Sequence, residues 1–221
     1  MNKGHLHLEV PIPSFQQQVD RLVTLDYPRL ARTTEPDFRD RLEPLRAGAE
    51  AIAGEDTPSR VPSVLVVTRD LVSPYDAVPL LHLSGSTKPG RVDRNHGEGD
   101  LDRYHPIEGC EPPGPAYLLV GVERGEEFCN VRPEDATAAI RARGRTPLTI
   151  DEGIALVTQV PETLEKNKCF MLAGSRRSAI SGDRRVPALW ISERAPKLGW
   201  CWDGNPHTWL GTASTGRRIG R

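Results

Sequence analysis

The stretch CFMLAGSRRSAISGDRRVPALWISERAPKLGWCWDGNPHTWLG, residues 169–211, decides the fold class. It contains three apolar runs, Cys169–Ala173, Val186–Ser192 and Lys197–Trp202, each bounded by Gly, Pro, Ser or Asp. Short apolar runs between such residues are typical of β-strands joined by turns. All four tryptophans and two of the four cysteines also lie in this stretch. We therefore expect a three-stranded unit here and look for a site close to it.

Similar patterns along the rest of the chain predict the other elements. Further strands are expected at 63–68, 78–84 and 116–122, and helices at 14–32, 37–53, 133–143 and 150–160. Thr149 and Glu152 have the spacing of a capping box at the start of the last helix. Together these elements predict a single α+β domain over 14–211, with a mostly antiparallel sheet and the amino-terminal and central helices packed on it. Flexible tails are expected at 1–13 and, with a basic character, at 212–221.

The loop between the first two strands of the stretch, residues 174–185, has the composition of an anion site. It holds two glycines, three serines and four arginines. Guanidinium groups bind carboxylates and phosphates through paired hydrogen bonds, so we assign Ser175, Arg176, Arg184 and Arg185 to ligand binding. The alternative is a solvated hairpin loop whose arginines pair with the acidic remainder of the chain.

The end of the stretch, residues 199–211, places tryptophans around a turn. Trp200 and Trp202 share one face of a strand, and Asp203-Gly-Asn205-Pro favours a turn directly after them. The rings either form an aromatic wall for a ligand, with Asn205 beside them, or close a small core. His207 is the acid–base candidate of this region, and we assign it a catalytic role on that basis.

A metal site is a second interpretation of the same region. Its candidate ligands are Cys169, Cys201, His207 and His96. Their spacing matches no standard zinc pattern, and buried inert cysteines with a polar turn around His96 are the alternative.

Composition and charge restrict the function classes. The net charge is −1, yet residues 169–221 carry nine basic and three acidic side chains, so this end would attract an anion. The sequence has no long Lys/Arg run, so nucleic-acid binding is not expected. It also has no apolar run long enough to span a membrane. No dinucleotide or P-loop glycine motif, GxSxG or HExxH occurs, so the sequence assigns no cofactor. Without a recognisable secretory leader, we expect a cytoplasmic protein with reduced thiols.

Four segments carry a resemblance to a known family: LVVTRDLVSPYDAVPLL, GPAYLLVGVERGEEFCNVRPEDA, GRTPLTIDEGIALVTQVPETLEKNKCFMLAGSR and DRRVPALWISERAPKLGWCWDGNPHTWLG. In this order they resemble an uncharacterised family of actinobacterial type, known only as a domain of unknown function, over Val64 to Gly211. The resemblance implies one intracellular domain and supplies no activity, cofactor or catalytic residue.

Three functions follow from these observations. The first is a binding protein or enzyme for a small anionic metabolite, held by the arginine loop and the tryptophan turn. The second is an interaction module whose basic, aromatic surface docks on an acidic protein partner. The third is a Cys/His metal protein.

Overall fold

A long strand pairing in the computed structural model joins β1 (Arg60–Val67) and β4 (Ala116–Glu123), which run antiparallel. Aliphatic residues dominate both strands, and most of their side chains are buried. The far edge of β4 pairs with β11 (Ser214–Thr215) and β12 (Arg217–Ile219), and β11 also pairs with β5 (Thr146–Pro147). These strands form a five-stranded sheet in which each pairing is antiparallel.

Residues 169–212 supply four of the five strands of a second sheet, and three of these confirm the predicted strands. Its order is β10 (Leu210–Thr212), β6 (Cys169–Met171), β8 (Arg185–Ser192), β9 (Ala195–Trp202) and β2 (Arg91–Val92). The two central pairings are antiparallel, whereas the two edge strands, β10 and β2, run parallel to their neighbours.

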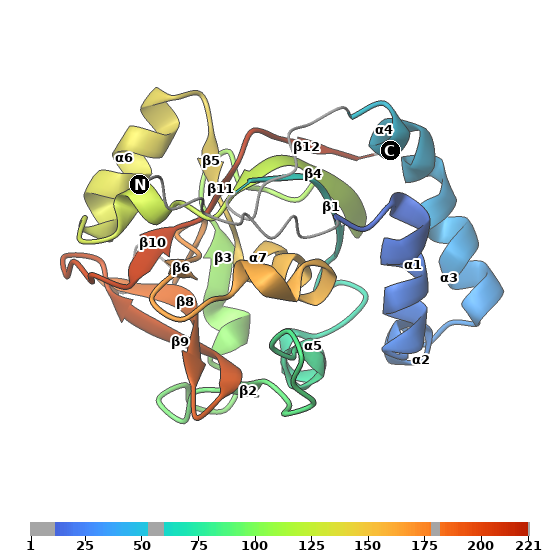
Figure 1. Cartoon of the computed structure of the whole chain (residues 1–221), viewed down its shortest axis with the longest axis horizontal. Coiled ribbons are helices and arrows are strands. Elements are labelled where there is room, and N and C mark those ends of the chain that lie inside the picture. Colours follow the sequence, from blue (N-terminus) through green and yellow to red (C-terminus); the bar gives the residue numbers. More distant parts are fainter. Residues whose placement is uncertain (1–11, 53–59, 178–181, 221) are drawn as a thin grey trace, which may run out of the picture.

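The two sheets belong to one compact domain (Figure 1). The structure describes residues 12–52, 60–177 and 182–220. Only Ala213 separates β10 in the second sheet from β11 in the first, so the chain passes directly between them. A third, two-stranded sheet pairs β3 (Tyr104–Pro106) with β7 (Ser175–Arg177). The predicted α+β class with a mostly antiparallel sheet is therefore confirmed.

Helix α7 (Ile150–Gln159) is the central helix of the domain. Nine of its ten residues are buried, and it packs on β1 and contacts β8. A helix that is buried on nearly every side belongs to the interior of a domain. Its predicted capping box is present, with the Thr149 side chain accepting from the Glu152 amide and the Glu152 carboxylate accepting from the Thr149 amide.

The amino-terminal helices lie beside β1, on the right of Figure 1. They are α1 (Phe15–Thr24), α2 (Tyr27–Leu30), α3 (Glu35–Leu42) and α4 (Arg46–Glu50). The Gln18 side chain attaches α1 to β1 by accepting from the Leu65 amide, 2.7 Å away. The two predicted helices are thus each divided, and Asp26, with φ 63°, marks the first interruption. The predicted central helix 133–143 is present as α6 (Pro133–Ala142).

The strand predicted at 78–84 is wrong. Residues Pro74–Ala77 form α5, and Val78–Leu80 continue it as a 3₁₀ turn. Ser73 caps α5 by accepting from the Tyr75 amide, and Pro79 has no N–H for a strand ladder. Local capping therefore outweighs the apolar character of this run.

The flexible basic tail predicted at 212–221 is also wrong over most of its length. Thr212 ends β10, and β11 and β12 follow within residues 214–219. Residues 1–11 of the predicted amino-terminal tail lie outside the described residues, whereas Ile12 and Pro13 are half-buried.

Arg218 fixes the carboxyl-terminal strand by pairing with Glu152, a residue with no exposed surface. Its Nε and Nη2 atoms donate to the two carboxylate oxygens at 2.6 and 2.8 Å. The Tyr117 hydroxyl and the Thr149 amide donate to the same carboxylate, each at 2.7 Å. Burial lowers the pKa of Arg218, but the hydrogen bonds to the Glu152 carboxylate and its charge outweigh burial and raise the pKa, so the guanidinium stays charged.

None of the helices in the described ranges is both long and apolar enough to cross a lipid bilayer.

Replacing Arg218 with Met is expected to lower the free energy of unfolding by about 3–5 kcal/mol, because it leaves a buried carboxylate without its cation. Urea titration measures the loss. Arg217→Met, which alters the exposed neighbour, is the matched control and should change stability by less than about 0.5 kcal/mol. Equal stability of the two variants would contradict the structural role of Arg218.

Candidate functional site

The small sheet of β3 and β7 joins the long segment at 85–115 to the arginine loop. Its register places His105 opposite Arg176 and Tyr104 opposite Arg177. Residues directly opposite each other in an antiparallel pair share a face, and their neighbours along the strand point to the other face. His105 and Arg176 therefore lie on one face, and Tyr104 and Arg177 on the other.

A hollow of about 460 Å³ opens beside this sheet. It is lined by His105, Pro106, Ile107, Glu108, Arg176, Arg177 and Asp183. The lining thus combines two arginines, one imidazole and two carboxylates on a short apolar wall, a mixture that suits a small polar ligand.

Arg176 is a mostly buried cation in the lining of this hollow. Its Nη1 atom donates to the Ala173 carbonyl at 2.6 Å, and its Nη2 atom donates to Asp203 at 3.1 Å. Burial lowers the pKa of the Arg176 guanidinium, and the Asp203 carboxylate offsets this only in part. The protein therefore compensates the charge of Arg176 incompletely.

The other arginines of the loop have closer acidic partners. Arg177 lies 3.2 Å from Asp100 and 3.0 Å from Asp183, and Arg185 lies 2.5 Å from Asp183. Arg184, whose side chain is 58% exposed, pairs with Glu134 at 2.9 Å. For Arg184 and Arg185 these contacts match the alternative interpretation, in which the arginines pair with acidic residues of the chain.

The tryptophans separate into two groups on opposite faces of the β8–β9 ladder. Trp200 packs edge-on against Trp202, with ring centres 5.3 Å apart, and the Arg185 guanidinium lies 5.1 Å from the Trp200 ring centre. Trp190 pairs with Lys197 in the register, so it points to the other face, where it meets Trp209 at 6.3 Å.

His207 belongs to the second of these groups. Its ring lies 5.6 Å from that of Trp209, and its buried Nε2 atom has no hydrogen-bond partner. The structure therefore places His207 with Trp190 and Trp209, apart from Trp200 and Trp202.

Two further predicted ligand residues have structural contacts. Ser175 is buried, and its hydroxyl accepts from the Ile150 amide at 3.0 Å, which satisfies the first turn of α7. Asn205 is exposed, and its backbone N–H closes the turn by donating to the Trp202 carbonyl at 3.1 Å.

The candidate metal ligands are engaged separately. His96 contacts Asp100 at 3.1 Å, the Cys201 thiol donates to the Met171 sulfur at 3.4 Å, and the Cys169 thiol donates to a carbonyl. Burial raises the pKa of Cys169, and it raises that of Cys201 to about 12, which disfavours the thiolate that metals bind. Across the ranges 12–52, 60–177 and 182–220, no three or more His, Cys, Asp or Glu side chains are grouped to hold a metal ion.

Sequence reasoning missed the residues that meet the arginine loop from afar. His105, Glu108 and Asp100 come from the irregular segment, about 70 residues before the loop, and only the β3–β7 pairing brings them to it. The signal that the sequence offered in this segment was His96 as a candidate metal ligand, and it did not indicate a contact with the arginine loop.

Comparison with known proteins gives a family without a described activity. A family model described as "Family of unknown function (DUF5701)" matches residues 21–221. This match confirms the resemblance to an uncharacterised family and extends it beyond Val64–Gly211. No curated protein and no solved structure matches the chain.

His207 gives the protein a predictable dependence on pH. Burial lowers its pKa below the ordinary value of 6.5, so the unfolded chain takes up this proton at a higher pH than the folded chain. The stabilising effect of neutral His207 is present above the unfolded pKa and is lost as the pH falls through the folded pKa. Urea titrations at several pH values should show that lowering the pH reduces the free energy of unfolding less in His207→Gln than in the natural chain. An NMR titration midpoint for His207 at or above 6.5 would contradict this prediction.

Proposed function

We propose that the chain, which belongs to this family of unknown function, binds a small anionic metabolite in the hollow beside β3 and β7. The metabolite carries a carboxylate or phosphate group, which Arg176 receives. The observation that supports this most is the position of Arg176, a mostly buried arginine that faces the hollow with one carboxylate partner.

The contacts of Arg176 explain why an anion is favourable there. Two backbone carbonyls, those of Ala173 and Ser175, accept from its Nη1 atom, and carbonyls are dipoles rather than full charges. Asp203, with a side chain 20% exposed, is the partner that carries charge. An added oxyanion would supply the charge-assisted hydrogen bonds that burial makes valuable.

The rest of the lining restricts the ligand. His105 lies on the same face as Arg176 and is exposed, so its imidazole can contact a bound group. Glu108 and Asp183 place negative charge at the same hollow, which disfavours a polyanion. We therefore favour a compact ligand with one anionic group. Trp200, Trp202 and His207 are not among the described residues that line this hollow.

Arg176→Met is expected to weaken binding of such a ligand about tenfold or more, because a charge-assisted hydrogen bond is lost. Calorimetric titration with inorganic phosphate, acetate and small phosphate monoesters measures the effect. Arg184→Met is the matched control, since Arg184 is exposed and is not among the residues that line the hollow. This variant should bind the ligand with the same affinity as the natural chain. Unchanged affinity in Arg176→Met, with the fold intact, would refute the assignment.

A second candidate function, docking on an acidic protein partner, is favoured by Trp202. Its side chain is 49% exposed, the largest exposure of a bulky apolar residue in the described part of the chain. Trp and Arg often dominate protein interfaces, and Arg185 lies against the neighbouring Trp200.

For this candidate, a purified partner that binds the natural chain should lose affinity about tenfold with Trp202→Ala and keep it with Arg176→Met. Surface plasmon resonance measures both. The opposite pattern would favour the small ligand.

A further inference from the structure

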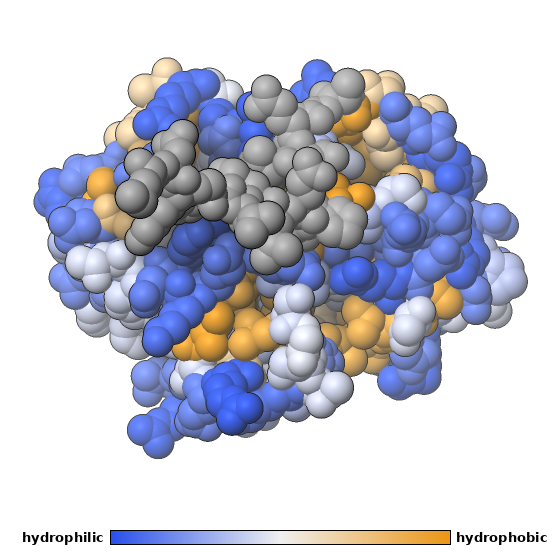
Figure 2. Space-filling view, viewed as in Figure 1, coloured by the Kyte–Doolittle hydropathy of each residue, from blue (hydrophilic) through white to orange (hydrophobic). Residues whose placement is uncertain are grey.

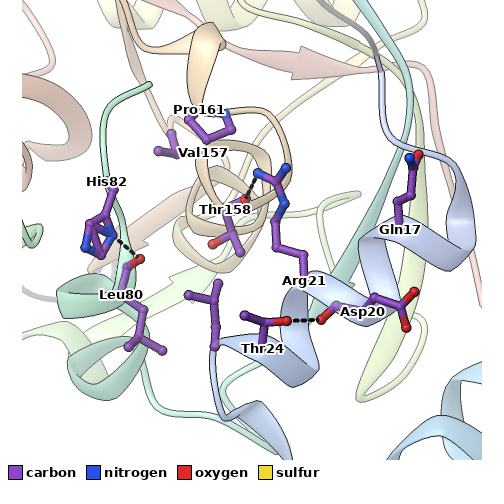
Figure 3. Close-up of a pocket in the computed structure, with 10 residues that line it drawn as sticks. Gln17, Asp20, Arg21, Thr24, Leu80, His82, Val157, Thr158 and Pro161 are labelled. Atoms are coloured by element: carbon purple, nitrogen blue, oxygen red, sulfur yellow. Dashed lines mark hydrogen bonds between the residues drawn. The ribbon is translucent and has the colours of Figure 1, made fainter. Parts of the chain in front are cut away.

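A second hollow, of about 430 Å³, lies between α1, α7 and the segment that follows α5 (Figure 3). None of its lining residues belongs to the hollow beside β3 and β7, so the two are separate. Figure 2 shows hydrophobic residues gathered in the space between α1 and α7. The described lining comprises Gln17, Asp20, Arg21, Thr24, Leu25, Leu80, His82, Val157, Thr158 and Pro161.

The wall of this hollow is apolar. Leu25 comes from the end of α1, Leu80 from the 3₁₀ turn after α5, and Val157 and Pro161 from α7 and the turn that follows it. Leu25 and Leu80 are partly buried against the main core, so the wall rests on a fixed surface. An apolar wall of this size suits a single ring or a short aliphatic chain.

Arg21 places a cation at the edge of this wall. Its Nη1 atom donates to the Thr158 carbonyl at 3.2 Å, which holds the guanidinium over α7. Among the ion pairs of the described residues, none includes Arg21. A half-buried cation with a carbonyl contact, beside an apolar wall, is complementary to a carboxylate on an apolar body.

The nearby acidic groups are directed to other partners. Asp20 pairs with Arg39 at 2.7 Å, and in Figure 3 its carboxylate points away from His82. Glu162, next to Pro161, accepts a hydrogen bond from the Ser84 hydroxyl at 2.9 Å. Arg21 is therefore the cation of this lining, and Asp20, the acidic residue of the same lining, is paired with Arg39.

His82 lies across the hollow from Arg21 in Figure 3. Its Nδ1 atom is 2.9 Å from the Leu80 carbonyl, which can only accept, so Nδ1 carries the hydrogen. In the neutral ring the Nε2 atom is then an acceptor. A ligand that extends from Arg21 to His82 would therefore carry a hydroxyl or N–H donor at the end opposite its carboxylate.

We propose that this hollow binds a small aromatic monocarboxylic acid. The carboxylate pairs with Arg21, the ring packs on Leu25, Leu80, Val157 and Pro161, and a donor at the far end of the ring meets His82. This site is independent of the proposed anion site, so each stands or fails alone.

The test uses three probes that share one ring: phenylacetate, 4-hydroxyphenylacetate and the neutral phenylacetamide. Calorimetry or NMR shift mapping on the whole chain should show phenylacetate binding at least about tenfold more tightly than phenylacetamide. Arg21→Gln should remove this preference, and Arg21→Lys should keep part of it. Arg29→Gln is the matched control, since Arg29 is an exposed arginine of the next helix that pairs with Asp26 outside the hollow.

The hydroxylated probe tests the opposite end of the site. It should bind more tightly than phenylacetate, and His82→Phe should remove that gain while leaving the preference for acid over amide. Equal binding of acid and amide by the natural chain would overturn the proposal. So would the absence of binding of either acid up to about 10 mM. Both outcomes are read on the natural chain, so they do not depend on whether a variant folds.

Discussion

The ion pair between Glu152 and Arg218 is the interaction on which the arrangement of the domain depends. A buried carboxylate is costly unless a cation and hydrogen bonds satisfy it. Glu152 meets that requirement only when α7, β4 and β12 are all in place, since its partners include Tyr117 and Arg218. The same carboxylate caps α7 through the Thr149 amide. One side chain thus couples the start of the central helix to strands from distant parts of the chain.

Most of the arginines in the basic carboxyl-terminal part of the described chain are paired with acidic residues that the fold brings close to them. Residues 169–221 are strongly basic, yet their arginines find acids from other segments: Arg177 meets Asp100, and Arg184 meets Glu134. Opposite charges at such distances cancel most of the field that the sequence implies. A basic segment is therefore weak evidence for an anion site. An informative residue is one whose charge the fold compensates incompletely, as for Arg176, where burial lowers the pKa despite the contact with Asp203.

Local signals predicted the elements that local forces determine. The capping box at Thr149 and the apolar runs at 169–202 gave α7, β6, β8 and β9, because caps and buried strands leave direct marks in sequence. The last strands were not predictable in this way. Their residues are polar, and they are held by Arg218 reaching a carboxylate 66 positions earlier. The candidate site also combines a residue that local sequence predicts with one that it does not. Arg176 was identified from the composition of its loop, whereas His105 could be identified only from the β3–β7 pairing.

The arginines proposed to bind ligands, Arg176 and Arg21, differ from the structural Arg218 in their contacts with the protein. Arg218 has a bidentate carboxylate and three further acceptors on the protein, so a ligand would add little to it. Arg176 has one carboxylate and a lowered pKa, and Arg21 has a carbonyl contact beside an apolar wall. Since an incompletely compensated cation gains from an added anion, the hollows next to these two arginines are the sites that we propose for ligands. Their linings then separate the proposed ligands. The acidic groups beside Arg176 disfavour a ligand with more than one negative charge, whereas the aliphatic groups beside Arg21 favour a ligand with an aromatic ring.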